Sequence, residues 1–224
     1  MTLSSNWSKD FFNAFEQSSS GQSLVNMMEL DLLVGSGGVL SHAPRRQQSA
    51  RMLIDSFMPE GITQLAVDSI FMMPQLGVLA NIDKEELKDD ASQAALEVFD
   101  NDCLIRLGTC VTPVGSIKPN SKMADVTLTF NDGTVKDLVI NEGTLEMMEY
   151  PYEEVKISIK PVRGIDVGAG KGEALDSVIY GGVVGLIFDG RNRPITLSKE
   201  SNKRIDSLLS WSKAVDEYPK GEVF

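Results

Sequence analysis

The pattern of hydrophobic and polar positions over residues 1–100 predicts helices that alternate with buried strands. Two short, continuous apolar runs, 32–34 and 62–67, are typical of strands that are covered on both faces. Apolar residues at helical spacing, with Pro44 as a favoured first helical residue, predict five helices, over 7–15, 24–28, 44–57, 70–80 and 84–98. We therefore expect an α/β part over residues 1–100.

The pattern changes after residue 100, where short β-type runs replace the helical period. These runs cover 104–107, 126–130, 135–140, 155–159 and 183–188. Asn131-Asp132-Gly133, between two of them, predicts the tip of a β-hairpin. A last helical pattern spans 197–218. We expect a β-rich part with a C-terminal helix over residues 101–224.

A glycine-rich turn follows the first predicted strand. The run after Val34 reads Gly35-Ser36-Gly37-Gly38, and Pro44 opens the next helix. Glycine accepts positive φ and has no Cβ, so a flat base or a ribose can approach the main chain of such a turn. The alternative is a turn that only lets two elements pack closely. The sequence predicts a nucleotide-binding candidate here and leaves both interpretations open.

Two further polar features follow this turn along the sequence. Arg45 and Arg46 occupy the first turn of the predicted helix, where the helix dipole disfavours positive charge. They indicate either a phosphate or acidic partner surface, or two solvated side chains. Asp68 ends a predicted buried strand. That position suits a ligand-binding carboxylate in an open α/β sheet, and it equally suits the cap of the following helix.

Two loops in the β-rich part also combine glycine with charge. The segment from Asp166 to Gly172 contains a lysine, but it lacks the spacing of a phosphate-binding P-loop, so a glycine loop between strands is the alternative. In the second loop, Asp189 with Arg191 or Arg193 forms either a ligand clamp or an ion pair that fixes a turn.

Composition narrows the classes of partner. The chain has 21 Lys and Arg residues against 32 Asp and Glu residues, a formal charge of -11, which repels nucleic acid and anionic lipid. No apolar run is long enough for a bilayer and the first residues do not resemble a signal peptide, so we expect a cytoplasmic protein. With two cysteines and one histidine, neither a structural zinc site nor a histidine-based catalytic pair is expected.

Five blocks of the chain together resemble a known family. They are residues 33–44, 67–68 together with 73–80, 107–109, 163–168 and 182–194. In order and spacing they are similar to the C-terminal half of the MutL-type accessory proteins of cobalamin-dependent glutamate mutase. The last block departs from the family pattern, since Asp189-Gly190-Arg191-Asn192-Arg193-Pro194 stands where the family reads Asp-Ala-Arg-Gly-Arg-Pro.

The resemblance implies an α+β fold, with an actin-like (ribonuclease-H-like) α/β part before the β-rich part. The family resembles the actin, sugar-kinase and chaperone ATPase superfamily, in which nucleotide lies between two related halves. In that scheme Gly35 to Gly38 match the adenosine turn of the second half. The Asp-x-Gly turn of the first half does not precede the matched region, so this chain alone is not expected to hydrolyse ATP efficiently.

The resemblance also implies a function. We expect the nucleotide-binding half of a chaperone-like reactivating protein, which uses ATP with magnesium in the complete protein and acts on the subunits of a cobalamin-dependent mutase. The alternative is a non-catalytic assembly module that docks on a mutase subunit. In either case the partner surface is expected around Asp166, Asp189, Arg191 and Arg193, while Arg45 and Asp68 are candidates for polar contacts with the nucleotide.

Overall fold

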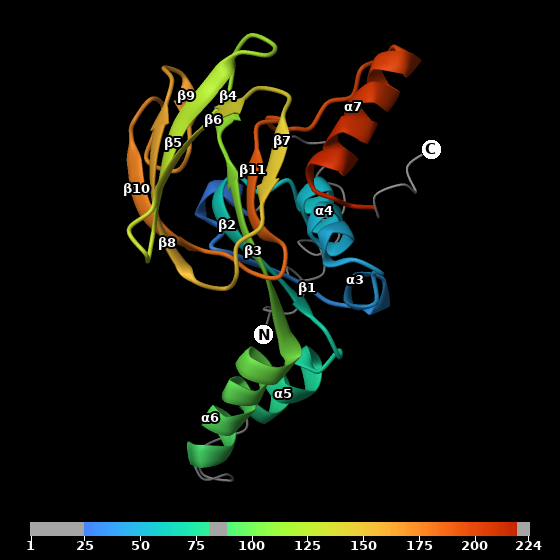
Figure 1. The fold of residues 1–224 in the computed structure, drawn as a ribbon. Coiled ribbons are helices and arrows are strands. Elements are labelled where there is room, and N and C mark those ends of the chain that lie inside the picture. The colour runs from blue at the N-terminus through green and yellow to red at the C-terminus, as the bar shows by residue number, and fades with distance from the viewer. Residues whose placement is uncertain (1–24, 81–88, 219–224) are drawn as a thin grey trace, which may run out of the picture.

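The structure, a computed structural model, describes residues 25–80 and 89–218 (Figure 1). The helix predicted over 7–15 lies outside the described residues. The first elements are η1 (Met27–Glu29), β1 (Leu32–Gly35), α3 (Gly38–Ser41), α4 (Arg46–Phe57), β2 (Gly61–Asp68), α5 (Met73–Ala80), α6 (Asp89–Val98) and the π-helix η2 (Phe99–Cys103). The remaining elements are β3 (Leu104–Thr112), β4 (Val114–Gly115), β5 (Lys122–Phe130), β6 (Val135–Asn141), β7 (Leu145–Met148), β8 (Glu154–Pro161), β9 (Ile165–Asp166), β10 (Leu175–Tyr180), β11 (Gly185–Asp189) and α7 (Ser201–Ala214).

Three layers make up the body of the molecule. A five-stranded sheet, in the order β1-β2-β3-β11-β7, has α4 and α7 on one face and a four-stranded sheet, β10-β8-β5-β6, on the other (Figure 1). Strand β11 shows how the central sheet serves both layers. Leu186 and Phe188 belong to the core shared with the four-stranded sheet, whereas Ile187 belongs to the core under the helices. This mixed α+β architecture confirms the predicted fold class at that level.

The central sheet combines strands from both sides of residue 100. β1 and β2 are parallel and are joined through α4, β2 pairs antiparallel with β3, and β3 pairs parallel with β11. The stretches 1–100 and 101–224 therefore share one sheet and one core. The four-stranded sheet is built wholly from the later stretch.

Local signals fixed several elements as predicted. β1 and β2 cover the two predicted strands, and the chain reverses between β5 and β6 at the predicted hairpin tip. The burial predicted for the first strand was wrong, because β1 is the outermost strand of the five-stranded sheet and its Leu32 is 37% exposed. There Gly133 has φ +83° and donates its N–H to the carbonyl of Phe130. The helix expected from Pro44 begins at Arg46 and ends at Phe57. The next residue, Met58, adopts the left-handed conformation before Pro59.

Other element predictions were wrong in extent or missed an element. The segment 24–28 contains only the short 3-10 helix η1, and the helix expected over 70–80 starts at Met73 because Asp68 closes a tight turn before it. The C-terminal helix spans Ser201–Ala214 rather than 197–218. Four strands were missed: β4, β7, β9 and β10. β4 and β9 have two residues each, too few to show a period.

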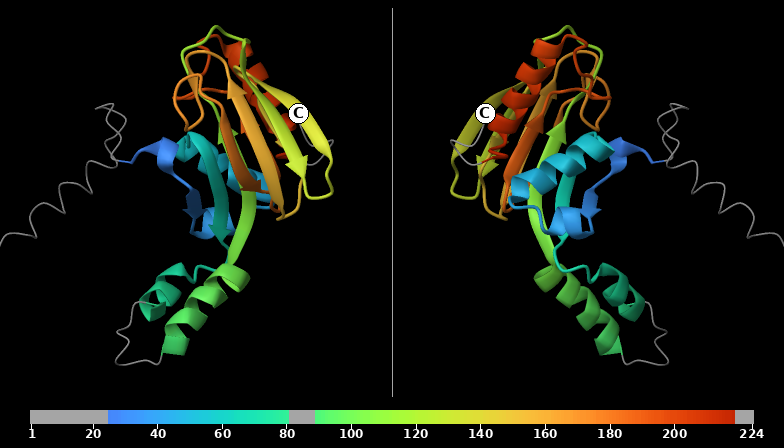
Figure 2. Two further views of the ribbon diagram at one scale, coloured as in Figure 1. Left: turned by 90° about the vertical axis from the view of Figure 1, so that its left-hand side faces the viewer. Right: turned by 90° about the vertical axis from the view of Figure 1, so that its right-hand side faces the viewer.

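Helices α5 and α6 extend away from the layered body as a helical arm (Figures 1 and 2). The chain leaves the body at the end of β2 and returns through η2 at the start of β3. Both views show the arm attached at this one end only.

Candidate functional site

The parallel strands β1 and β2 end side by side, and this edge collects the first group of predicted site residues. Gly35 at the end of β1 is in register with Val67, and Asp68 is the next residue of β2. Open α/β sheets bind ligands beyond the carboxyl ends of parallel strands. We call Ser36, Gly37, Gly38 and Asp68 the glycine-turn edge.

Asp68 connects the two strand ends. Its side chain is fully buried and accepts hydrogen bonds from Ser36 Oγ at 3.2 Å, from Met72 N at 3.1 Å and from Met73 N at 3.0 Å. Burial raises the pKa of this carboxyl, but the hydrogen bonds from Met73, Met72 and Ser36 outweigh it, and the net pKa lies below its ordinary value. Asp68 is therefore an anion that caps α5 and also ties that cap to the glycine turn.

The glycines of the turn have different roles. A Cβ on Gly35 would lie 2.7 Å from a methyl carbon of Leu40 and 2.8 Å from one of Leu53, so this glycine serves close packing. Gly37 has φ +106° with nothing within 4 Å of a Cβ, and Gly38 has only His42 Cδ2 at 4.0 Å. The backbone of Gly37 and Gly38 is thus open to an approaching ligand, while Gly35 is not.

Arg45 and Arg46 are engaged by the chain itself. Arg45 forms an ion pair of 2.6 Å with Asp216, beyond the end of α7, and both side chains are about one third exposed. Arg46 Nη1 donates to the carbonyls of Leu40 and Ser41 at 3.5 and 2.9 Å. The carboxylate and carbonyl oxygens offset the cost of positive charge at the start of α4. The structure therefore gives these arginines local partners within the fold.

Asp189, Arg191 and Arg193 form a buried ion network rather than a surface. Asp189 accepts hydrogen bonds from Arg191 N at 3.0 Å and from Arg191 Nε, Arg191 Nη2 and Arg193 Nη2, each at 2.9 Å. The side chains of Asp189, Arg191 and Arg193 are 0%, 1% and 4% exposed. The partner surface predicted at these residues was wrong, because a folded partner cannot reach them. The alternative interpretation, an ion pair that fixes a turn, agrees with this geometry.

The network also joins α4 and α7. Arg191 Nη1 lies 2.8 Å from Asp55 Oδ1, and the centroid of the Trp211 ring lies 5.0 Å from the Arg191 guanidinium and 5.7 Å from that of Arg51. Burial raises the pKa of Asp189, but the arginines outweigh it and the net pKa is lowered. For Arg191, burial lowers the pKa, yet Asp189 and Asp55 leave it above its ordinary value. These charges hold the turn after β11 against the helical layer.

Asp166 organises the glycine loop that joins β9 to β10. Its Oδ1 accepts hydrogen bonds from Gly168 N at 2.8 Å and Gly170 N at 3.1 Å, and both glycines have φ +114°. The carboxylate is therefore used within its own loop. The segment connects two strands, as the alternative to a phosphate-binding loop predicted.

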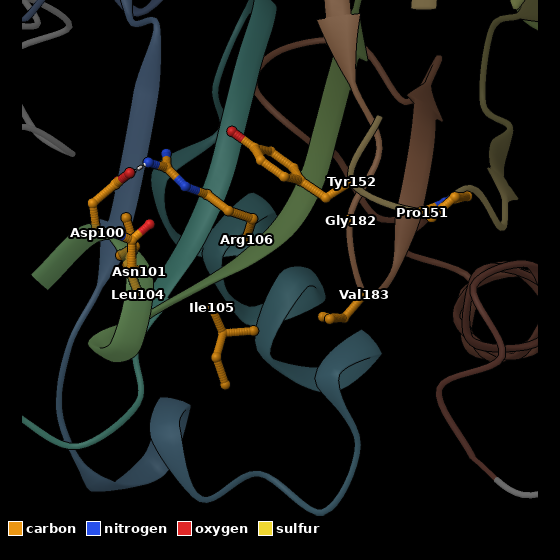
Figure 3. A pocket seen from close by; sticks show the side chains of 9 residues that line it. All are labelled: Asp100, Asn101, Leu104, Ile105, Arg106, Pro151, Tyr152, Gly182 and Val183. Atoms are coloured by element: carbon orange, nitrogen blue, oxygen red, sulfur yellow. Dashed lines mark hydrogen bonds and ion pairs between the residues drawn. The ribbon is translucent and has the colours of Figure 1, made fainter. Parts of the chain in front are cut away.

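A groove at the base of the helical arm was not foreseen (Figure 3). It has a volume of about 620 Å³ and is lined by Asp100, Asn101, Leu104, Ile105, Arg106, Pro151, Tyr152, Gly182 and Val183. These residues come from three separate segments, so no single sequence motif announces the groove. We call it the arm-base groove.

Comparison with protein families adds to the geometry of the glycine-turn edge. The model described as MutL protein matches residues 9–96, a stretch that contains β1, the glycine turn, α4, β2 and α5. Over residues 9–96 the chain is similar to this family, which supports the family resemblance seen in the sequence. The matched region includes every residue of the glycine-turn edge. No curated protein and no solved structure matches the chain.

Two searches of the described residues complete the description of this chain. Over 25–80 and 89–218, no group of three His, Cys, Asp or Glu side chains is arranged to hold a metal ion. None of the helices within the same ranges has the length and apolar character needed to cross a bilayer.

Proposed function

We propose that this MutL-type chain is the nucleotide-binding half of an accessory protein that reactivates a cobalamin-dependent mutase such as glutamate mutase. In the complete protein, ATP with magnesium binds between this half and a related, actin-like half. ATP hydrolysis supplies the free energy for conformational work on the mutase, while cobalamin carries the radical chemistry. The residues of this chain contribute binding and positioning of the nucleoside end.

The open backbone of Gly37 and Gly38 is the observation that carries this proposal. A base or ribose needs a main-chain surface without side chains, and among the described residues a Cβ on either glycine would meet no atom closer than 4.0 Å, its chain neighbours apart. The turn lies at the carboxyl edge of the parallel pair β1–β2, where ligands of open α/β sheets bind. Asp68 holds this edge together through Ser36, so the turn is positioned before the ligand arrives.

A titration of the chain with adenosine, ADP and a non-hydrolysable ATP analogue, followed by calorimetry, tests the proposal. Gly37→Val places a β-branched side chain in the open space and is expected to weaken binding about tenfold or more, which corresponds to about 1.4 kcal/mol. Gly133→Val is the matched control, because Gly133 also has positive φ (+83°) and nothing within 4 Å, but it lies at the β5–β6 hairpin tip. Equal affinities of the two variants, or no binding to the unaltered chain, would contradict the nucleotide site.

A second candidate function is a non-catalytic assembly module that docks on a mutase subunit. The arm-base groove favours it, since the groove presents partly exposed Tyr152 and Val183 rather than a closed site. Co-precipitation with glutamate mutase subunits, with and without ATP, separates the two functions. Recovery that changes with ATP supports the reactivating protein, whereas recovery that is indifferent to ATP supports the assembly module.

A further inference from the structure

The arm-base groove leaves large apolar side chains in water. Tyr152 is 53% exposed and Val183 is 60% exposed, and Leu104 and Ile105 line the same space. Contiguous apolar surface with a polar rim on a folded domain is typical of an interaction site. Figure 3 shows Asp100 meeting the Arg106 guanidinium at one end of the groove and Pro151 at the other.

The aromatic wall of the groove is held in place before any partner binds. The Arg106 guanidinium lies 5.9 Å from the centroid of the Tyr152 ring, which in turn lies 5.6 Å from the ring of Tyr180. The floor is fixed by backbone hydrogen bonds, since Val183 N donates to the Arg106 carbonyl at 3.0 Å. Tyrosine and arginine are the side chains most enriched in the energetic centres of protein interfaces, and a rigid surface loses little entropy on binding.

Charge around the groove indicates the chemistry of its occupant. Asp100 lines the groove, and Asp102, Glu149 and Glu153 lie within two residues of lining positions; all four side chains belong to exposed residues. The cation in the lining, Arg106, is already paired with Asp100. That pair adds no net charge, so the negative charge beside the lining comes from Asp102, Glu149 and Glu153. The chain as a whole has a formal charge of -11, and complementary potentials favour a positive partner.

We propose that the arm-base groove docks a linear segment of a partner protein in which apolar side chains alternate with lysine or arginine. The apolar side chains of the segment cover Leu104, Ile105 and Val183, and its cations meet the exposed Asp102 and Glu153 beside the lining. The interaction requires no nucleotide, so it stands or falls independently of the glycine-turn edge.

Three synthetic peptides of equal length test this proposal by calorimetry with the full chain. One alternates Leu with Lys, one Leu with Glu, and one Ser with Lys. The Leu/Lys peptide is expected to bind with one-to-one stoichiometry and an affinity that falls as salt rises, because part of the attraction is ionic. Val183→Asp and Tyr152→Ala are each expected to weaken its binding about tenfold or more.

Val178→Asp is the matched control. Val178 is 42% exposed, lies on β10 and is not among the residues that line the groove, so the same charge is added at a comparable apolar position. Thermal denaturation of all variants checks that they are folded. The proposal is overturned if the Leu/Lys peptide does not bind, if either of the other peptides binds as tightly, or if Val183→Asp and Val178→Asp bind it alike.

Discussion

Two strands of the central sheet end in a fully buried aspartate, and the two carboxylates accept hydrogen bonds from different kinds of donor. β2 ends at Asp68, whose carboxylate is held by neutral donors: two backbone N–H groups and one serine hydroxyl. β11 ends at Asp189, which is held by two guanidinium groups and a backbone N–H. β11 is parallel to β3, whereas β2 is antiparallel to β3. The two aspartates therefore lie at opposite ends of the strands of this sheet.

The difference separates the structural ion network around Asp189 from the candidate binding edge at Asp68. At Asp189, the arginines bring charge from the chain's own turn, and Trp211 and Asp55 close the cluster on the helical side. At Asp68, the neighbouring Gly37 and Gly38 leave open space. A buried carboxylate at a strand end is thus not by itself a sign of function. What matters is whether the surrounding groups are already paired within the fold.

The largest expected effect comes from removing the carboxylate of the buried ion network. Asp189→Ala leaves two buried guanidinium groups without their anion, and the free energy of unfolding is expected to fall by about 3–5 kcal/mol. Urea denaturation measures it. Asp125→Ala is the control, because Asp125 forms an exposed pair with Lys122 and its loss is expected to cost less than about 1 kcal/mol. A similar loss in the free energy of unfolding for both variants would remove the distinction between the buried ion network and an exposed ion pair.

An intermediate effect is expected at the open edge. Asp68→Asn replaces an anion by an amide whose NH2 group faces N–H donors, so at least one of Met72 N, Met73 N and Ser36 Oγ loses its acceptor. We expect a loss of about 1–3 kcal/mol of stability and faster amide exchange at Met72 and Met73. Ser36→Ala removes only one of the three bonds and is expected to cost about 0.5–1.5 kcal/mol. Unchanged exchange at both amides in Asp68→Asn would show that the carboxylate does not hold the α5 turn.

A smaller effect is expected from a methyl group in the glycine turn. Gly37→Ala forces a Cβ onto φ +106° and is expected to cost about 1–2 kcal/mol, although the space around it is empty. Gly38→Ala, one residue later and without a positive φ, is expected to be nearly neutral in thermal denaturation. Equal melting temperatures for the two variants would contradict the assigned turn geometry.

The smallest effect on stability is expected from titration of the two aspartates. It is smallest at neutral pH and grows as the solution becomes acidic. Both have a pKa below the ordinary value in the folded chain, so the unfolded chain binds protons first as pH falls. Their stabilisation is complete above the unfolded pKa of about 4 and is lost as pH falls through the folded values. Urea denaturation across this range should show a shallower acid dependence for Asp189→Asn than for the unaltered chain. An identical acid dependence would mean that other groups govern it.

Local pattern alone predicted much of the fold and half of the candidate site. The continuous apolar runs identified β1 and β2, Asn131-Asp132-Gly133 identified the hairpin, and the glycine turn after β1 was located residue by residue. These features depend on backbone conformation and on burial within one segment, which a sequence of a few residues encodes. The family match over residues 9–96 covers β1, the glycine turn and β2, and the hairpin lies outside it.

Only the tertiary structure decided what the charged and polar residues do. Asp189 and Arg191 carry the same sequence signal as an exposed clamp, and their burial depends on Trp211 and Asp55, which lie far away in the chain. The arm-base groove likewise assembles from three distant segments. The sequence itself determined several of the helices and strands, the acidic character and the glycine turn. The partners of each charge depend on long-range packing, and a local pattern does not encode that packing.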